Sequence, residues 1–308
     1  IEGSYDLTFQ GVVATGSPQP PFGGPASEGQ SARVDIRATG GAYEAVFTSR
    51  WGEPAAYTVA VDPGGAATGT YALVISAITG SAVGVTADGS SRDATTTMPG
   101  ERIYRTFPVS AGRRIWVRVT SSDKRMAVSI LAPGGAVLAS DTANGNETLL
   151  DLEAPDVATG GTYTLVIDPS GGTTGTFTYV LSAIDEVPVP IVADGTSRTG
   201  STTLAGEVSR RTFTVAAGRR VYARVTGPAT GTTISILGPD GAVVAGPVAS
   251  LGGTTAVETV LGSAPSGGTY SLLVDPAGSV TGDYAAIVSV IDEQPIADRK
   301  STRLNSSH

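Results

Sequence analysis

The chain has 308 residues, a formal net charge of −8 and no cysteine. The lack of cysteine excludes disulfides and thiolate metal sites, so the chain must fold by burying apolar side chains, which are 40% of its residues. The acidic balance argues against nucleic acid as a partner and against a polybasic membrane contact, and no apolar stretch is long enough for a spanning helix.

The first region, residues 1–79, begins with Ile1-Glu2-Gly3, without an initiator methionine or a signal-peptide pattern. We therefore interpret the sequence as a fragment of a longer protein. Within this region Tyr57–Pro63 predicts a strand that ends in an Asp-Pro turn. Val34-Asp35-Ile36 faintly resembles the later segment Val128-Ser129-Ile130. The region is either a degenerate or partial copy of the later modules or a different β-sandwich.

A long repeat organises the rest of the chain. Gly161–Pro169, with the sequence GTYTLVIDP, recurs at Gly268–Pro276 as GTYSLLVDP. Farther upstream, Ala111–Arg114 recurs at Ala217–Arg220 with an offset of 106 residues. A unit of this length is the size of an independent sandwich domain and is too long for a solenoid repeat.

The repeat therefore predicts one module at residues 80–186 and a second at residues 187–293. The boundary Asp185–Pro190, with the sequence DEVPVP, is rich in proline and is typical of a semi-rigid linker. Residues 294–297 resemble the start of the next linker, so we expect further modules to be joined covalently in the intact protein.

Alternation of apolar and polar residues predicts strands. In Ile115–Val119 the side chains of Ile115, Val117 and Val119 share one face, and the segment Val221–Val225 repeats the pattern. One buried and one solvated face favours antiparallel sheets. Seven to nine short strands per module are too many for one flat sheet, so the predicted fold is all-β: tandem antiparallel β-sandwiches of jelly-roll or Greek-key type.

Several recurring residues have structural interpretations. Tyr57, Tyr163 and Tyr270 each begin a predicted strand and resemble the tyrosine corner of Greek-key sandwiches, in which the phenol bonds to a neighbouring loop. Gly112 and Gly218 recur at equivalent positions of the repeated Ala-Gly-Arg-Arg segment, which favours a structural role.

The repeated pattern supports a resemblance to a known family. Each module contains Phe-x-x-x-Ala-Gly-Arg-Arg, then Ser-Ile-Leu-x-Pro, then Gly-Thr-Tyr-x-Leu-x-x-Asp-Pro, and finally Thr-Gly before an aromatic-led strand. Residues 80–293, and in part 57–79, thus resemble bacterial pre-peptidase C-terminal (PPC-like) sandwich repeats of large secreted proteins. The resemblance implies an extracellular accessory domain and supplies no catalytic residue.

The sequence contains no pattern typical of an enzyme or of a cofactor site. The one histidine, His308, is the last residue of a terminal segment that we interpret as an artefact, so serine–histidine and cysteine–histidine nucleophiles are excluded from the rest. Phosphate-loop and dinucleotide fingerprints are also missing. Acidic residues such as Asp168 and Asp275 recur once per module at turns, which favours a structural role over paired-carboxylate catalysis.

Two kinds of binding site are possible, and the first is a metal site. Asp62, Asp168 and Asp275 are candidate Ca²⁺ ligands, and the alternative is an Asp-Pro turn in which the carboxylate accepts local backbone hydrogen bonds.

Aromatic and cationic side chains alternate on the predicted outer strand faces. Trp116 with Arg118, and Tyr222 with Arg224, could stack on sugar rings, so these four residues are the candidate ligand-binding site. The alternative is that each arginine covers its aromatic neighbour on a solvated strand.

The last eleven residues, Asp298–His308, match one reading frame of a common short-read sequencing adapter codon by codon. An ordinary polar tail is the alternative interpretation. We interpret the segment as an artefact at the end of a metagenomic reading frame and expect no packed contacts from it, including from Leu304.

The sequence leaves three function classes. The first is a non-catalytic spacer or interaction stalk in a large secreted or cell-surface bacterial protein, with an extracellular polysaccharide or a surface protein as partner. The second is a carbohydrate-binding accessory region of a secreted hydrolase, either a peptidase or a glycosidase. The third, an enzyme, is disfavoured because the histidine and cysteine nucleophile systems are missing.

Overall fold

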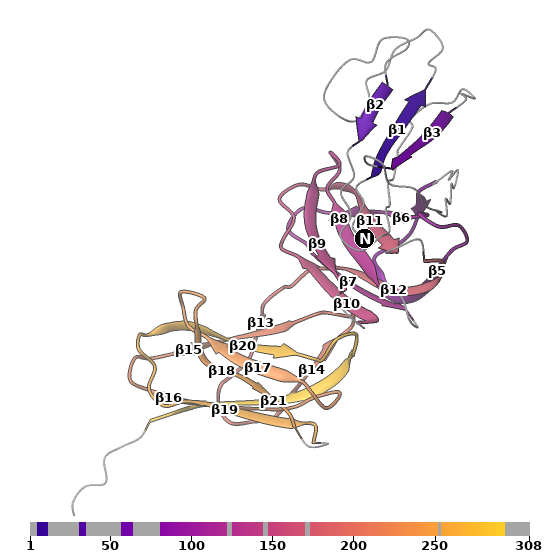
Figure 1. The fold of residues 1–308 in the computed structure, drawn as a ribbon. Helices are drawn as coiled ribbons and strands as arrows, with labels where there is room; N and C mark the ends of the chain where they lie inside the picture. The colour runs from indigo at the N-terminus through magenta and orange to yellow at the C-terminus, as the bar shows by residue number, and fades with distance from the viewer. Residues whose placement is uncertain are drawn as a thin grey trace, which may run out of the picture. The chain divides into compact units, whose positions relative to one another are not determined.

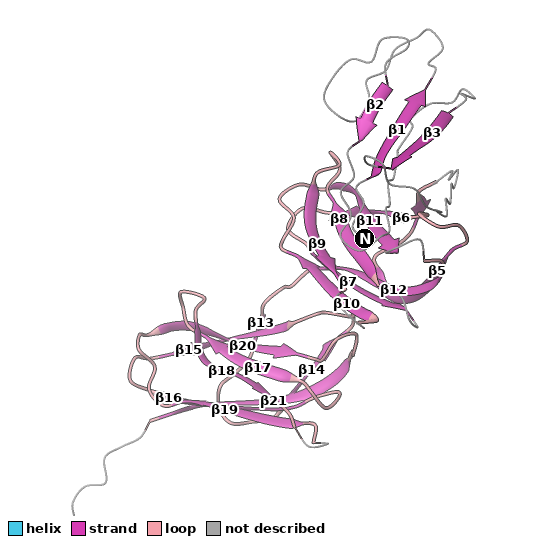
Figure 2. Ribbon diagram, in the orientation of Figure 1, coloured by secondary structure: helices cyan, strands magenta, loops and turns pink. Residues whose placement is uncertain are grey.

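The computed structural model describes the backbone of three strands before residue 80, and residues 81–121, 125–143, 147–169, 173–251 and 254–292. These residues form strands and loops, and none of them is helical (Figure 2). The chain divides into two compact units. Unit 1 comprises Ile1–Thr79, Met98–Glu101 and Gly171–Thr173, and unit 2 comprises the remainder.

The described strands of residues 1–79 form a three-stranded sheet. The strands are β1 (Tyr5–Gly11), β2 (Ser31–Val34) and β3 (Tyr57–Pro63), in the order β2-β1-β3 (Figure 1). Both pairs are antiparallel, and the β1–β3 register runs from Tyr5↔Pro63 to Gly11↔Tyr57. The strand predicted over Tyr57–Pro63 is therefore β3. The side chains of Tyr57 and Asp62, and the terminal segment Asp298–His308 with Leu304, lie outside the described residues.

The first sandwich contains nine strands. They are β4 (Val83–Gly84), β5 (Asp88–Thr96), β6 (Ile103–Val109), β7 (Arg114–Ser121), β8 (Met126–Leu131), β9 (Val137–Thr142), β10 (Leu149–Ala154), β11 (Gly161–Pro169) and β12 (Gly175–Ile184). One sheet has the order β10-β7-β12-β5 and the other β4-β6-β11-β8-β9. We call these the four-stranded and the five-stranded sheet.

The second sandwich repeats this topology strand for strand (Figure 1). Its strands are β13 (Val189–Pro190), β14 (Arg198–Thr202), β15 (Ser209–Val215), β16 (Arg220–Thr226), β17 (Thr233–Leu237), β18 (Val243–Ala249), β19 (Ala256–Leu261), β20 (Gly268–Asp275) and β21 (Gly282–Ile291). The sheet orders are β14-β21-β16-β19 and β13-β15-β20-β17-β18. The all-β tandem sandwich predicted from the sequence is confirmed.

Each sandwich encloses its own apolar core. Ile115, Val117 and Val119 of β7 are all fully buried, as their alternation predicts, because they face the five-stranded sheet. The core of the first sandwich contains apolar side chains between residues 94 and 183, and that of the second contains side chains between residues 191 and 288. Burying an aliphatic or aromatic side chain contributes about 1.5–3 kcal/mol each, so the two cores stabilise the two copies separately.

The recurring tyrosines lie near the start of β11 and β20, and the recurring glycines lie in the turns that precede β7 and β16. The Tyr163 hydroxyl donates to the Thr159 carbonyl over 2.7 Å, and the Tyr270 hydroxyl donates to the Ser266 carbonyl over the same distance. Gly112 has a φ of 81° and its N–H donates to the Val157 carbonyl over 2.8 Å. A side chain would strain that left-handed conformation, which explains the glycine.

The proline-rich boundary differs from the linker that the sequence predicts. Val189 and Pro190 form β13, which pairs in parallel with Arg211 and Thr212 of β15. Because β13 is an edge strand, the missing N–H of Pro190 is tolerated there. The linker between the last strand of the first sandwich and the first strand of the second is therefore only Asp185–Pro188.

Candidate functional site

The candidate site of the first sandwich lies on the outward side of β7. Arg114, Trp116 and Arg118 alternate there with the buried core residues of the same strand. Trp116 is nevertheless only 7% exposed, because it packs in a small apolar cluster with Ile184 of β12 and with Ala205, which belongs to the second sandwich. The solvated face expected from the alternation is covered at Trp116.

A turn of the second sandwich provides this cover. We call Thr203–Glu207, with the sequence TLAGE, the docking turn. Its conformation is fixed from within, because the Glu207 carboxylate accepts the backbone N–H groups of Thr203 and Leu204 over 2.6 and 2.9 Å. The Glu207 N–H in turn donates to the Leu204 carbonyl over 3.0 Å.

Gly206 brings the docking turn close to Trp116. Its φ is 75°, and a Cβ at this position would lie 2.3 Å from atoms of the Trp116 ring. Any side chain at Gly206 would therefore clash with the indole as well as strain the backbone. Both the conformation and the contact require glycine.

Arg114 ties the docking turn to the first sandwich by charge-assisted hydrogen bonds. Its Nη2 donates to the Gly206 carbonyl over 2.6 Å and to the Glu186 carboxylate over 2.5 Å, and its Nη1 contacts Glu153 of β10. The side chain is only 11% exposed, so these bonds are shielded from solvent better than a surface ion pair is.

Arg118 forms its hydrogen bonds within its own sandwich, although its guanidinium also lies against Gly278 of the second sandwich. Its Nε and Nη2 donate to the two carboxylate oxygens of Asp151 on β10, each over 2.6 Å. The hydrogen bonds to Asp151 raise the pKa of Arg118. The guanidinium carbon also lies 5.6 Å from the centre of the Trp116 ring, a distance typical of a cation–π contact.

The second sandwich presents the equivalent residues in a more open setting. Tyr222 and Arg224 of β16 stand where Trp116 and Arg118 stand on β7, and Tyr222 is partly exposed. Arg224 makes an ion pair of 3.4 Å with Glu258 of β19. Desolvation and the hydrogen bond to Glu258 raise the pKa of Tyr222.

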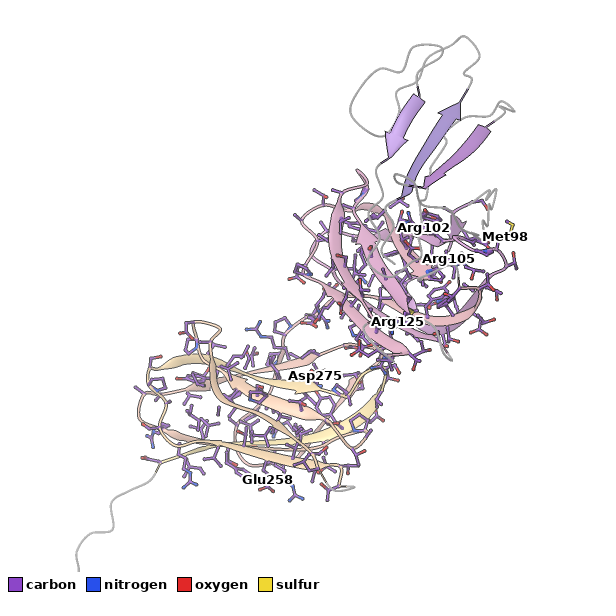
Figure 3. All side chains as sticks on the ribbon, in the orientation of Figure 1. Met98, Arg102, Arg105, Arg125, Glu258 and Asp275 are labelled. Carbon is purple, nitrogen blue, oxygen red and sulfur yellow. The ribbon has the colours of Figure 1, made fainter. Side chains whose placement is uncertain are left out.

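The candidate calcium ligands occupy different surroundings. The carboxylate of Asp168 pairs with Arg102 at 2.8 Å, and Asp275 is an exposed residue at the end of β20, where Figure 3 labels it. Across the described residues, no group of three or more histidine, cysteine, aspartate or glutamate side chains is arranged to hold a metal ion. A calcium role for either aspartate stays a prediction.

A repeated ion pair was missed in the sequence reasoning. Asp88 accepts hydrogen bonds from the Ser90 N–H over 3.0 Å and from the Arg92 guanidinium over 2.9 Å, and together they hold the pKa of Asp88 well below its usual range. Asp194 is bound in the same way by Arg198 and by the Thr196 N–H, and its pKa is lowered too. In both copies the sequence has an Asp-Gly pair with an arginine four residues after the aspartate, and this repeated pattern indicates the ion pair.

A second missed feature joins the two sheets of each sandwich. Arg105 of β6 donates to the hydroxyl of Tyr179 on β12 over 3.1 Å. The equivalent Arg211 of β15 donates to the hydroxyl of Tyr284 on β21 over 2.7 Å. Each guanidinium also lies within 5.7 Å of its tyrosine ring centre, so one arginine bridges the sheets by a hydrogen bond and a cation–π contact.

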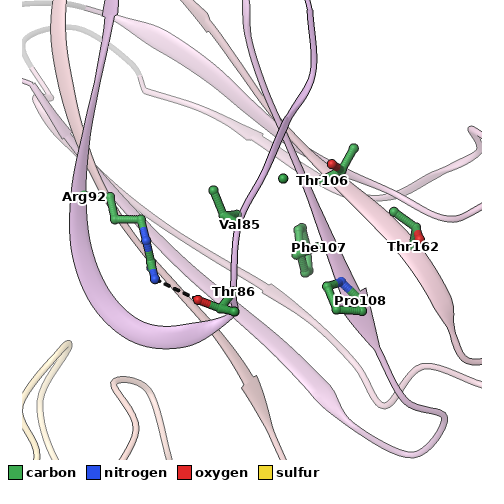
Figure 4. Close-up of a pocket in the computed structure, with 8 residues that line it drawn as sticks. Val85, Thr86, Arg92, Thr106, Phe107, Pro108 and Thr162 are labelled. Carbon is green, nitrogen blue, oxygen red and sulfur yellow. Dashed lines mark hydrogen bonds between the residues drawn. The ribbon is translucent and has the colours of Figure 1, made fainter.

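The first sandwich also has a shallow groove of about 590 Å³ (Figure 4). It is lined by Gly84, Val85, Thr86, Arg92, Thr106, Phe107, Pro108 and Thr162. Arg92 is the charged residue of this lining, and its guanidinium already bonds to Thr86 and Asp88. The groove therefore presents little uncommitted polar chemistry to a ligand.

No family model matches the chain, and no curated protein matches it by sequence. Among solved structures, the chain is similar to the pre-peptidase C-terminal domain of collagenase from Bacillus anthracis, with 16% identity, a TM-score of 0.29, and coverage of 35% of this chain and 100% of that one. It is also similar to Aeromonas hydrophila PliG, a periplasmic inhibitor of g-type lysozyme, with 14% identity, a TM-score of 0.27 and coverage of 34% and 100%.

A third likeness is to the CBM22-1-CBM22-2 tandem of Paenibacillus barcinonensis Xyn10C, with 10% identity, a TM-score of 0.19 and coverage of 60% and 82%. At these values the likenesses carry no argument about function. Among the described residues, no helix has the length and apolarity needed to span a membrane.

Proposed function

We propose that the two sandwiches are part of a non-catalytic, extracellular repeat array that serves as a spacer or interaction stalk of a large secreted or cell-surface bacterial protein. The observation that carries the proposal is the use of the outer face of β7. The Trp116 ring, the candidate ligand platform, is buried against the next sandwich in the chain, where Ala205 and Gly206 contact it.

This junction combines the contacts that fix one sandwich against the next. Apolar burial of Trp116 and Ile184 supplies non-directional stabilisation, while the bond from Arg114 to the Gly206 carbonyl sets the orientation of the turn. The short linker limits the distance over which the two copies can separate. A fixed geometry between consecutive sandwiches is what we expect of a rigid spacer, whereas independent binding modules do not require it.

The proposal predicts a narrow distribution of distances between the two sandwiches. Val137 and Val243 are exposed residues at equivalent positions on β9 and β18, and the chain has no cysteine, so Val137→Cys with Val243→Cys gives a clean spin-label pair. Pulsed electron paramagnetic resonance should show one narrow peak. A broad distribution in this otherwise unsubstituted chain would contradict the spacer role.

Gly206→Ala should broaden the peak, because the new methyl group would clash with Trp116. Gly218→Ala is the matched control: Gly218 has a φ of 78°, and a Cβ there would meet nothing within 4 Å. Both substitutions carry a similar backbone cost of about 1 kcal/mol. Equal broadening by both variants would show that the junction contact does not set the geometry.

A carbohydrate-binding accessory role is the second candidate, and the partial exposure of Tyr222 beside Arg224 favours it. The test is a glycan-array screen of the full chain. Binding that is lost in Tyr222→Ala, and retained when the exposed Val243 is replaced by alanine, would support this role. Silence across the array would leave the spacer as the function that fits the structure.

A further inference from the structure

Each sandwich contains both halves of the junction. The turn Thr97–Glu101 connects β5 to β6, has the sequence TMPGE and is equivalent in the sequence to the docking turn TLAGE. It is closed in the same way, with the Met98 N–H donating to the Glu101 carboxylate over 3.2 Å and the Glu101 N–H donating to the Met98 carbonyl over 3.1 Å. The turn is thus a repeated element of the module, not a peculiarity of one copy.

The receiving face is repeated as well. We call the outward side of β7, β10 and β12 around Trp116 the covered face, and its equivalent on β16, β19 and β21 around Tyr222 the open face. Strand register aligns Ile184 with Arg114 on the covered face, and Ile291 with Arg220 on the open face. Ile184 is 1% exposed and Ile291 is 37% exposed, so equivalent isoleucines differ in cover.

The open face carries a valine where the covered face carries a glutamate. Val260, which is 44% exposed, lies beside Tyr222 at the position where Glu153 lies beside Trp116. Neighbouring exposed apolar side chains of this kind mark interaction surfaces more often than isolated ones do. Arg220 stands at the position of Arg114, the residue that binds the carbonyl of the docking turn.

We propose that the open face binds the docking turn of a further module of this type, joined in tandem. The inference rests on the proposed spacer function and names its repeating contact. Tyr222 takes the place of Trp116 under the glycine of the turn, and Arg220 takes the place of Arg114 at its carbonyl. The docking turn of the second sandwich defines what the occupant must contain. It has a glycine in the left-handed conformation, which is preceded by an apolar residue, and a glutamate that accepts the backbone N–H groups of the turn.

The sequence after β21 matches this arrangement. Asp292-Glu293-Gln294-Pro295 repeats the pattern of Asp185-Glu186-Val187-Pro188, which leads from the covered face into the second sandwich. Glu186 pairs with Arg114 at the existing junction, and Glu293 is its equivalent in the sequence. The same spacing between face and linker can therefore present the next turn to the open face.

Disulfide trapping tests the inference. The chain has no cysteine, so only the introduced cysteines can form a disulfide. The test protein is the full chain with a second copy of residues 187–293 inserted directly after Glu293. One cysteine replaces Ile291 in the original copy and the other replaces Ala205 in the inserted copy, so that Tyr222 and the glycine of the turn are both kept. The reference is the unextended chain with Ile184→Cys and Ala205→Cys, which probes the junction present in the structure.

We expect the pair across the open face to form an intramolecular disulfide at a rate within about tenfold of the reference pair, because both are tethered by equivalent linkers. Adding Leu204→Asp to the inserted copy should slow it by about tenfold or more, because the charge would have to be buried. Leu251→Asp in the inserted copy is the matched control, since Leu251 is 77% exposed.

Three outcomes would overturn the inference. They are a disulfide that forms no faster than one with Val243→Cys in place of Ala205→Cys, equal slowing by both aspartate substitutions, and disulfides only between separate chains. The last outcome would assign the open face to self-association. Failure of the reference pair would instead contradict the spacer function, so the two ideas fail separately.

Discussion

Strands β7 and β16 occupy equivalent places in the two sandwiches, with the same strand register and an equivalent pair of arginines on their outer faces. The surroundings of these two faces differ. Trp116 is buried beneath a turn of the next sandwich, while Tyr222 is partly exposed. The comparison shows that the repeat preserves the aromatic residue and the two arginines of the outer face as well as the fold, while their exposure to solvent changes. A face that looks like a ligand platform in one copy is a packing surface in the other, so equivalent residues acquire their role from the module that comes next in the chain.

The largest expected effect comes from the cores, where the two copies should behave alike. Phe107 and Phe213 are equivalent buried residues of β6 and β15. Phe107→Ala should destabilise the first sandwich by about 3–5 kcal/mol, and Phe213→Ala should do the same to the second. Hydrogen exchange of the backbone amides, measured separately for each sandwich at increasing urea concentration, gives the stability of each one. Equal loss of protection in both sandwiches from either substitution would show that they unfold as one body.

A smaller and unequal effect is expected at the two faces. Trp116→Ala should cost about 2–4 kcal/mol in the free energy of unfolding, because it opens a buried apolar cluster. Tyr222→Ala should cost less than about 1 kcal/mol, because its ring is only partly covered. Thermal and urea unfolding of both variants provide the comparison. If the two costs were equal, the contrast between the covered and the open face would be wrong.

The smallest effect concerns the carboxylates of Asp88 and Asp194, for which the two sandwiches should again agree. Because folding lowers each pKa, their contribution is present above the unfolded pKa of about 4 and is lost as the pH falls below it. Replacing both with asparagine should therefore flatten the decrease in Tm between neutral pH and about pH 2.5. Differential scanning calorimetry measures the slope, and an unchanged slope would count against these pairs.

Much of the fold could be predicted from local sequence. The alternation in Ile115–Val119 and the turn glycines predict antiparallel strands because both signals act within a few residues. The offset of 106 residues predicts that the topology repeats, and it does. Strand β13 was not predicted, because Val189-Pro190 becomes a strand only by pairing with β15, and no local pattern encodes that partner.

The sheet-bridging arginines show why part of the site was missed. Arg105 bonds Tyr179, but the equivalent Arg211 bonds Tyr284, which stands two residues earlier on its strand than the equivalent of Tyr179. Aligning the two copies pairs each tyrosine with a residue that has no phenol, Ala286 and Phe177 respectively. Because the arginine is long enough to reach either position, the bridge is kept although the sequence match is lost.

By itself the sequence determined the fold class and the repeat, because strand alternation and turn chemistry depend on neighbours along the chain. Only the tertiary structure decided what the outer face of β7 contacts. The atoms that cover Trp116 come from Ala205 and Gly206, far along the sequence and in another sandwich. An exposed aromatic and a buried one have the same local pattern, and the difference between them is made by a distant turn.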